Sequence, residues 1–240
     1  MTKNSPRRSR GDKKKLPLAI FDIDGTLFRK NLQFELLEGL SYEGIFSRKS
    51  RDKLVEYYRA WLENKNSYEA YRKMLIHLYR KEIKGCDPKE VKKVAKRVAA
   101  FHHGRLFVYT SDLFKKLKKT HFMVAISGSP VEIVSEFNQY LDFDRAYGTV
   151  FEVDEKGLYT GKEEFVPVAD KSQIVKELIS GEGYSTHHSY GVGDTDSDVS
   201  FLSMVDHPIA FNPDLSLKKK AEREGWKIIV ERKDVVYEIR

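Results

Sequence analysis

The sequence contains a single cysteine, Cys86, among its 240 residues. One cysteine excludes an internal disulfide and is typical of a protein kept in a reducing compartment. No apolar run approaches the roughly 20 residues that a membrane-spanning helix needs. The charged first 15 residues also lack the apolar segment of a secretory signal. These absences predict a cytoplasmic protein without a membrane span.

Apolar residues are nevertheless plentiful. They make up 40% of the chain, with 14 Phe and 13 Tyr, beside 33% charged residues. This mixture is sufficient for a packed core, which excludes a chain that is disordered throughout. The length predicts one large domain, or a domain that carries an insertion.

The net charge of +7 is concentrated at the N-terminus. Residues 1–15 hold seven of the 43 basic residues and one of the 36 acidic residues, which leaves 36 basic and 35 acidic residues in the rest. We therefore predict that residues 1–15 form a disordered basic leader on a nearly neutral body. Weak binding of this leader to nucleic acid or to a membrane surface is the alternative.

Short apolar runs alternate with helical patterns along the chain. Runs at 16–28, 122–127 and 189–194 each lead into Gly and polar positions, as buried strands do at the edge of a sheet. After the second run, Ser129 is expected to cap a helix whose first residue is Pro130. The alternation predicts an α/β fold, with a Rossmann-like, mainly parallel sheet covered by helices on both faces.

Further along, the patterns become shorter. Strands are expected at Pro208–Phe211 and Lys227–Val230, with a helix at Leu215–Glu224 between them, and a helical stretch is expected from about 197 to 204. Residues 146–161 alternate around a turn and predict a β-hairpin.

Residues 31–105 show no strand pattern. Aromatic and aliphatic side chains recur there at helical spacing in two stretches, and a third helix is expected at Asp87, with Pro88 first and Glu90 completing a capping box. This pattern predicts a helical cap inserted after the first strand, between core segments 16–30 and 106–240. Its aromatic stripes are expected mainly to pack between the cap helices, with a few residues facing a substrate.

The first polar cluster, Asp22-Ile23-Asp24-Gly25-Thr26, follows the first strand. Two carboxylates separated by one residue suit Mg²⁺ binding, nucleophilic attack on phosphorus and general acid/base catalysis. Gly25 would permit a tight turn. In isolation the same residues also fit a turn with solvated aspartates.

Three further clusters complete a chemical set. Ser127 and Gly128 end the second strand at a helix start, which suits phosphate binding. Lys171 opposes the dipole at another helix start, which is unfavourable unless it serves an anion. Asp194, Asp196 and Asp198 repel one another unless a cation or partners compensate. Alone, the serine and the lysine also fit an ordinary helix entry and a surface position. The carboxyl ends of parallel strands share one edge, so the clusters should meet there.

Taken in order, FDIDGTLF, ISGS, Lys171 and GVGDTDSD resemble the four motifs of the haloacid dehalogenase superfamily. The helical insertion matches the place of the C1 cap in that superfamily. The stretch AFNPDLSLKKKAEREGWKII at 210–229 resembles its phosphoserine-phosphatase-like branch, subfamily IB. The resemblance spans about residues 17–231 and leaves the basic leader outside.

The resemblance implies roles for particular residues. Asp22 would be the nucleophile and Asp24 the general acid/base, and this second acid favours phosphatases and mutases. The phosphate would be bound by Thr26, Ser127, Gly128 and Lys171. Mg²⁺ would be held by Asp22, by the backbone carbonyl of Asp24 and by Asp194. Asp198 would be a second acid of the metal site, which either binds Mg²⁺ through water or orients Lys171.

The function implied is Mg²⁺-dependent hydrolysis of a small-molecule phosphate monoester through an aspartyl phosphate on Asp22. Two residues depart from true phosphoserine phosphatases, which carry Glu in place of Asn31 and Asn in place of Ser197; both put phosphoserine in doubt as the substrate. The alternatives are a phosphotransferase or phosphomutase that uses the same site. A non-catalytic adaptor that binds nucleic acid or a membrane surface through residues 1–15 is a third alternative.

Overall fold

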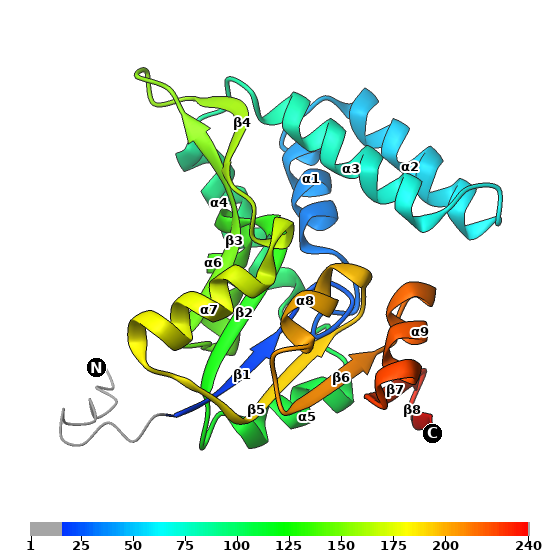
Figure 1. Cartoon of the computed structure of the whole chain (residues 1–240). Coiled ribbons are helices and arrows are strands. Elements are labelled where there is room, and N and C mark those ends of the chain that lie inside the picture. Colours follow the sequence, from blue (N-terminus) through cyan, green and yellow to red (C-terminus); the bar gives the residue numbers. More distant parts are fainter. Residues whose placement is uncertain (1–15, 240) are drawn as a thin grey trace.

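A computed structural model describes residues 16–239 (Figure 1). Its sheet has eight strands in the order β4-β3-β2-β1-β5-β6-β7-β8, parallel except at its two outer pairs, β3–β4 and β7–β8. The strands are β1 (Pro17–Phe21), β2 (Phe122–Pro130), β3 (Arg145–Val153), β4 (Tyr159–Phe165), β5 (Ser185–Gly193), β6 (His207–Phe211), β7 (Lys227–Arg232) and β8 (Val235–Ile239). The predicted α/β fold with a mainly parallel, Rossmann-like sheet is confirmed.

Helices cover both faces of the sheet, and the central strand β1 is therefore buried on both sides. In β1, Leu18 and Ile20 pack on one face and Ala19 and Phe21 on the other, as the two-residue period of a strand requires. The first face is covered by α7 (Lys171–Glu182), α8 (Val199–Leu202) and α9 (Leu215–Glu224). The second face is covered by α5 (Val108–Leu117) and α6 (Val131–Leu141).

The predicted helical insertion contains four helices where three had been expected. They are α1 (Leu32–Tyr42), α2 (Arg48–Leu62), α3 (Tyr68–Ile83) and α4 (Pro88–His102). Figure 1 shows α2 and α3 side by side above the carboxyl ends of the strands, while α4 packs against α6 of the core. The helix at Pro88 begins as predicted, because the Asp87 side chain accepts a hydrogen bond from the Lys89 N–H.

Three local predictions differ from the structure. Ser129 and Pro130 belong to β2, and α6 begins at Val131 without a side-chain cap, because the Ser129 hydroxyl bonds to Asp24 instead. The helical stretch expected from 197 to 204 is shorter, with a 3₁₀ turn at Asp196–Asp198 before α8. Strand β8 was not predicted. The β3–β4 hairpin and helix α9 are confirmed.

None of the helices in the described part of the chain is long and apolar enough to cross a membrane. The predicted basic leader, residues 1–15, lies outside the described residues. The expected cap boundary at 31–105 stays a prediction. The hydrophobic cluster that fills the space between the sheet and the helices continues without a break from Phe21 and Phe137 in the core to Leu36, Leu54 and Leu75 in the insertion.

Candidate active site

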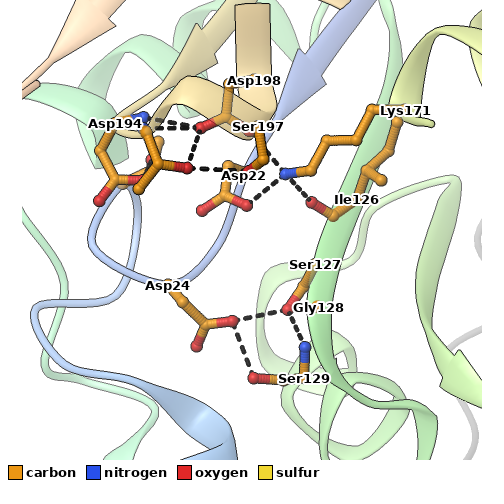
Figure 2. Close-up of polar contacts among 12 residues, drawn as sticks. Asp22, Asp24, Ile126, Ser127, Gly128, Ser129, Lys171, Asp194, Ser197 and Asp198 are labelled. Carbon is orange, nitrogen blue, oxygen red and sulfur yellow. Dashed lines mark hydrogen bonds and ion pairs between the residues drawn. The ribbon is translucent and has the colours of Figure 1, made fainter. Parts of the chain in front are cut away.

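The four predicted clusters meet at the carboxyl edge of the sheet (Figure 2). Strand β1 delivers Asp22 and Asp24, its neighbour β2 delivers Ser127, and its other neighbour β5 leads to Asp194. Lys171 opens α7. This convergence follows from the parallel pairing of β1 with both neighbours, which brings equivalent strand ends to one edge.

Lys171 lies at the centre of the buried part of the site. Its ammonium donates to Asp22 Oδ1 at 2.6 Å, to Asp198 Oδ1 at 2.6 Å and to the Ile126 carbonyl at 2.9 Å, and the residue is fully buried. Burial alone would lower the pKa of Lys171, but the charges of Asp198 and Asp22 outweigh it and raise that pKa. The lysine therefore stays a cation and compensates two neighbouring carboxylates.

Asp22 is held by one oxygen only. Oδ1 accepts from Lys171, whereas Oδ2 makes no hydrogen bond to the part of the chain that the structure describes. Burial raises the pKa of Asp22 to about 8; Lys171 opposes this shift, and the charges of Asp198 and Asp24 add to it. An additional positive charge beside Oδ2 would return this carboxyl to the anion that a nucleophile requires.

Asp24 accepts hydrogen bonds on both oxygens. Oδ1 accepts from the Leu32 N–H at 2.6 Å, and Oδ2 accepts from Ser127 and Ser129 at 2.6 and 2.8 Å. Burial raises the pKa of Asp24, and these three donors oppose that shift. The result is a carboxyl whose orientation is fixed on both oxygens and whose pKa is raised, two properties that suit proton transfer to and from a substrate.

Gly25 allows the loop to approach Asp194. Its φ of +86° is left-handed, and a Cβ built on it would lie 2.2 Å from Asp194 Oδ2. On the other side Thr26 donates from its hydroxyl to Asp194 Oδ1 at 3.2 Å. The Asp-x-Asp-Gly-Thr sequence thus folds around a carboxylate that is distant in sequence.

Asp198 shapes the loop that carries Asp194. Its Oδ2 accepts from the backbone N–H groups of Asp194 and Thr195 at 3.0 and 2.9 Å, while its Oδ1 accepts from Lys171. The close approach requires Gly193, because a Cβ there would lie 2.5 Å from the Asp198 side chain. Ser197, the residue that departs from the phosphoserine phosphatase pattern, shares a hydrogen bond with Thr195.

A cavity of about 100 Å³, here called the catalytic cavity, opens above these groups. Four of the predicted residues, Asp22, Asp24, Gly128 and Asp194, line it. The other four, Thr26, Ser127, Lys171 and Asp198, are completely buried behind its wall. The predicted phosphate-binding roles of Thr26, Ser127, Gly128 and Lys171 stay predictions.

The cap closes the catalytic cavity with one residue of the predicted aromatic stripes, Tyr68, and with two arginines that the sequence pattern did not single out. Tyr68, Arg72 and Arg80 reach it from α3. Each arginine is already paired, Arg72 with Glu69 and Arg80 with Glu163. The sequence placed these arginines in a predicted cap helix but gave no further signal. A helix presents several faces, and the sequence does not show which of them faces the core.

The residues fit a magnesium ion. Asp22 and Asp194 are hard oxygen donors, and the Asp24 backbone carbonyl lies in the same loop. Burial raises the pKa of Asp194 well above its usual range, and the charge of Asp22 adds to that shift. The buried carboxylates repel one another, and among the described residues Lys171 is the buried cation that compensates them. A bound divalent cation would stabilise this set of oxygen donors further.

His187, His188 and Asp206 form a separate cluster on the surface, away from the catalytic cavity. His187 and His188 have ligand atoms within 4.8 Å of those of Asp206, all on the surface near the start of β5, whose other end leads to Asp194. The sequence holds a second pair of adjacent histidines, His102 and His103, whose side chains point to different partners: His102 contacts Glu35 and His103 stacks on Tyr140. Neither pair belongs to the catalytic cavity.

Comparisons with known proteins agree with this geometry. The model of the haloacid dehalogenase-like hydrolases matches residues 19–203. The chain is 26% identical to the inhibition of morphological differentiation protein of Streptomyces azureus, over 88% of this chain and 77% of that protein. It is 27% identical to a probable phosphatase of Mycobacterium tuberculosis, over 88% and 74% respectively.

The fold is also similar to that of solved enzymes. A substrate-bound phosphoserine phosphatase structure superposes with a TM-score of 0.62 at 22% identity, covering 93% of this chain and 96% of that one. At this identity the likeness supports the fold alone, while the family match covers most of the chain. The chain belongs to the haloacid dehalogenase-like hydrolases, and its relatives with phosphatase names support a phosphomonoesterase.

Proposed function

We propose that this enzyme hydrolyses a small-molecule phosphate monoester with Mg²⁺, through a phosphoryl group carried transiently on Asp22. The observation that carries the proposal is the unequal treatment of the two carboxylates in the catalytic cavity. Asp22 is held by a cation and keeps Oδ2 free of hydrogen bonds to described residues, whereas Asp24 is held by neutral donors on both oxygens. The arrangement of Asp22 suits a nucleophile, and that of Asp24 suits a group that donates and accepts a proton.

In the first half-reaction, Asp22 Oδ2 attacks phosphorus and the ester P–O bond breaks. Asp24 gives its proton to the departing alkoxide oxygen, which leaves as the alcohol. Lys171 keeps Asp22 Oδ1 fixed throughout, so the attacking oxygen has one orientation. When bound by Asp22, Asp194 and the Asp24 carbonyl, Mg²⁺ supplies positive charge beside the phosphoryl oxygens.

In the second half-reaction, Asp24 takes a proton from water and that water attacks the phosphoryl group on Asp22. The Asp22–phosphorus bond breaks and inorganic phosphate leaves, with both carboxyls restored. The catalytic cavity, closed by α3, limits the water that reaches the intermediate. Transfer to an alcohol in place of water, the transferase alternative, uses the same residues.

The test begins with the wild-type protein and a panel of phosphate monoesters. Hydrolysis is expected with Mg²⁺, loss of activity with EDTA, and recovery when Mg²⁺ is restored. Asp22→Asn removes the nucleophilic anion and a metal ligand, so its kcat should fall by at least about 10⁴-fold. The matched control is Asp112→Asn, which alters an exposed carboxylate of α5. Full activity in Asp22→Asn would overturn the mechanism.

Asp24→Asn separates the two half-reactions. An aryl phosphate needs little help from an acid, so the variant should still transfer its phosphoryl group to Asp22 but hydrolyse the intermediate slowly. Intact mass after an acid quench should then show one added phosphoryl group, and peptide mapping should place it on Asp22. An intermediate on another residue would contradict the assignment. Transfer to added glycerol in preference to water would support the transferase.

A further inference from the structure

A second cavity, of about 220 Å³, lies beside the catalytic cavity under the cap. Five aromatic side chains line it, and we call it the aromatic cavity: Phe34 from α1, Tyr58 and Trp61 from α2, and Tyr68 and Tyr71 from α3. The two cavities adjoin, because Tyr68 and Asn31 line both. Gly25, which lines the aromatic cavity, directly follows Asp24.

The aromatic rings present a partly uncovered surface to this space. Most pairs are edge-on or tilted, with centroids 5.1 Å apart for Trp61 and Tyr68 and 5.4 Å apart for Tyr58 and Tyr71, while Trp61 and Tyr71 are stacked at 6.5 Å. Tyr58 and Tyr68 remain 38% and 40% exposed, although Tyr71 behind them is buried. The sequence pattern assigned these stripes mainly to packing between helices, with a few residues facing a substrate. Aromatic surface left uncovered beside a reacting centre is available to a ligand.

The charged groups around the aromatic cavity are already paired. The Arg29 guanidinium donates to Glu231 and to the Leu106 carbonyl. Lys30 donates to Glu35 at 2.6 Å, and the other oxygen of Glu35 lies 3.0 Å from His102 Nε2. A charged leaving group would therefore have to break one of these pairs, whereas an uncharged ring would leave them intact.

Tyr68 connects the two cavities. Its side chain lines the catalytic cavity together with Asp24 and Asp194, and it also lines the aromatic cavity. Its ring also lies against Trp61. A substrate whose phosphate lies at Asp22 can therefore extend along the Tyr68 ring into the aromatic cavity.

We propose that the aromatic cavity binds the leaving group, and that the substrate is a phosphate monoester of an alcohol carrying an uncharged aromatic ring. This inference rests on the proposed phosphatase function and specifies its substrate class. The size agrees, since an apolar cavity of about 150 Å³ accommodates benzene. Asn31 agrees as well, because its side chain caps α1 by accepting from the Phe34 N–H at 2.9 Å and offers no anion to a substrate ammonium.

The test compares alcohols of similar acidity, so that the leaving group's chemistry stays constant. The substrates are 2-phenylethyl, 2-cyclohexylethyl and ethyl phosphate, with phosphoethanolamine as the charged member. For 2-phenylethyl phosphate, kcat/KM should exceed that for ethyl phosphate by about 10- to 100-fold, the scale of burying a phenyl group. The kcat/KM for 2-phenylethyl phosphate should also exceed that for 2-cyclohexylethyl phosphate by about 2- to 10-fold, because an aromatic ring packs better against the aromatic side chains. Equal values, or phosphoethanolamine ranking first, would overturn the inference.

Variants show where the preference arises. Trp61→Leu keeps apolar volume but removes a π-face, so the ratio of kcat/KM for the phenyl ester to that for the cyclohexyl ester should fall toward one. Trp61→Ala should also lower the phenyl-to-ethyl ratio, and thermal melting checks that its fold persists. Tyr42→Ala is the matched control, since Tyr42 is an aromatic residue of the cap that is 85% exposed and lies outside the aromatic cavity. An unchanged ratio in folded Trp61→Leu and Trp61→Ala would place the preference elsewhere.

A binding measurement separates this inference from the phosphatase proposal. Trp226→Phe leaves Trp61 as the single tryptophan, because the chain has two. Non-hydrolysable 2-phenylethylphosphonate should change Trp61 fluorescence saturably, and ethylphosphonate should not. A response without hydrolysis of any ester would uphold the aromatic site and overturn the phosphatase. Hydrolysis of ethyl phosphate without any fluorescence change on adding 2-phenylethylphosphonate would uphold the phosphatase and overturn the aromatic site.

Discussion

At the scale of single residues, the candidate site depends on close approaches that few side chains permit. Gly25 lies against Asp194 and Gly193 lies against Asp198, in each case with no room for a Cβ. The first contact joins the loop after β1, which carries the proposed nucleophile, to the proposed metal ligand Asp194, and the second holds the loop that carries Asp194. A substitution that only adds a methyl group should therefore change the chemistry more than the stability.

Gly25→Ala tests this directly. The variant gains a left-handed alanine and a Cβ 2.2 Å from Asp194 Oδ2, so Asp194 must move. We expect kcat/KM to fall by about 100-fold, since displacement by about 1 Å has effects of that size. Gly157→Ala is the matched control, with a similar φ of +80° and nothing within 4 Å. Both variants should lose roughly 1–2 kcal/mol of unfolding free energy, but only the first should lose activity; equal kinetics would contradict the argument.

The residues of the site were predictable to the extent that they end strands or open helices. Asp22 and Asp194 directly follow β1 and β5, Lys171 opens α7, and Ser127 lies near the carboxyl end of β2. Parallel pairing brings those positions together. Ser129 was wrongly predicted as a helix cap, because its actual partner, Asp24, is 105 positions away in sequence. A short motif predicts local geometry but does not show that the hydroxyls of both Ser127 and Ser129 reach Asp24 beyond the neighbouring strand.

At the scale of elements, a half-buried carboxyl joins the core helix α6 to the β3–β4 hairpin. Glu132 in the first turn of α6 accepts a hydrogen bond at 2.5 Å from the Tyr159 hydroxyl of β4. Burial raises its pKa above the ordinary 4.5, although Tyr159 and the charge of Lys92 on α4 oppose the shift. Because the folded protein favours the protonated form, folding stability should decrease as the pH rises through this raised pKa.

Glu132→Gln should therefore be more thermostable than the wild type at pH 7.5. Gln keeps an acceptor for Tyr159 but has no charge to bury, and the advantage should shrink below about pH 4, where both side chains are neutral. A gain of a few degrees is expected, since about 1 kcal/mol moves Tm by roughly 2–4 °C at this size. Calorimetry across the pH range measures it, with the exposed Glu155→Gln as control. A variant less stable at pH 7.5 would show that the carboxylate is needed.

The limits of prediction differ between elements for physical reasons. Helix α9 was predicted with its observed bounds, because Asp214 caps it and Gly225 ends it in a left-handed conformation. Strand β8 escaped prediction because all five of its residues are exposed, so no alternation of apolar and polar positions marks it. In the insertion, α1 was missed as a separate helix although Asn31 caps it.

At the scale of the whole molecule, the cap and the sheet share a hydrophobic cluster. Leu36 and Leu75 of the cap belong to the same buried set as Phe21 and Phe137 of the core. The catalytic and aromatic cavities both lie at this junction, between α3 and the strand ends. The surface that binds a substrate is therefore built by residues distant in sequence. This explains why the motifs indicated the reaction, whereas the substrate class needed the assembled fold.

Residues 1–15 are the remaining part of the molecule with a distinctive composition, and we expect them to be dispensable for the chemistry. They carry most of the net charge of +7, while the rest of the chain is nearly neutral. Each of the residues proposed for catalysis lies at or beyond Asp22. A chain that begins at Lys15 should therefore keep its kcat and KM on small phosphate esters.

The same truncation should change how the protein binds polyanions. Full-length protein should elute from heparin at higher salt than the truncated chain, because each neutralised phosphate or sulfate releases counterions and makes binding depend steeply on salt. A peptide of residues 1–15 fused to an unrelated neutral protein provides the control, and it should confer the same salt dependence. A large loss of kcat on truncation would instead show that the leader takes part in the reaction. Equal elution would assign the remaining affinity to the folded body, where Arg72 and Arg80 are the cations that line the catalytic cavity.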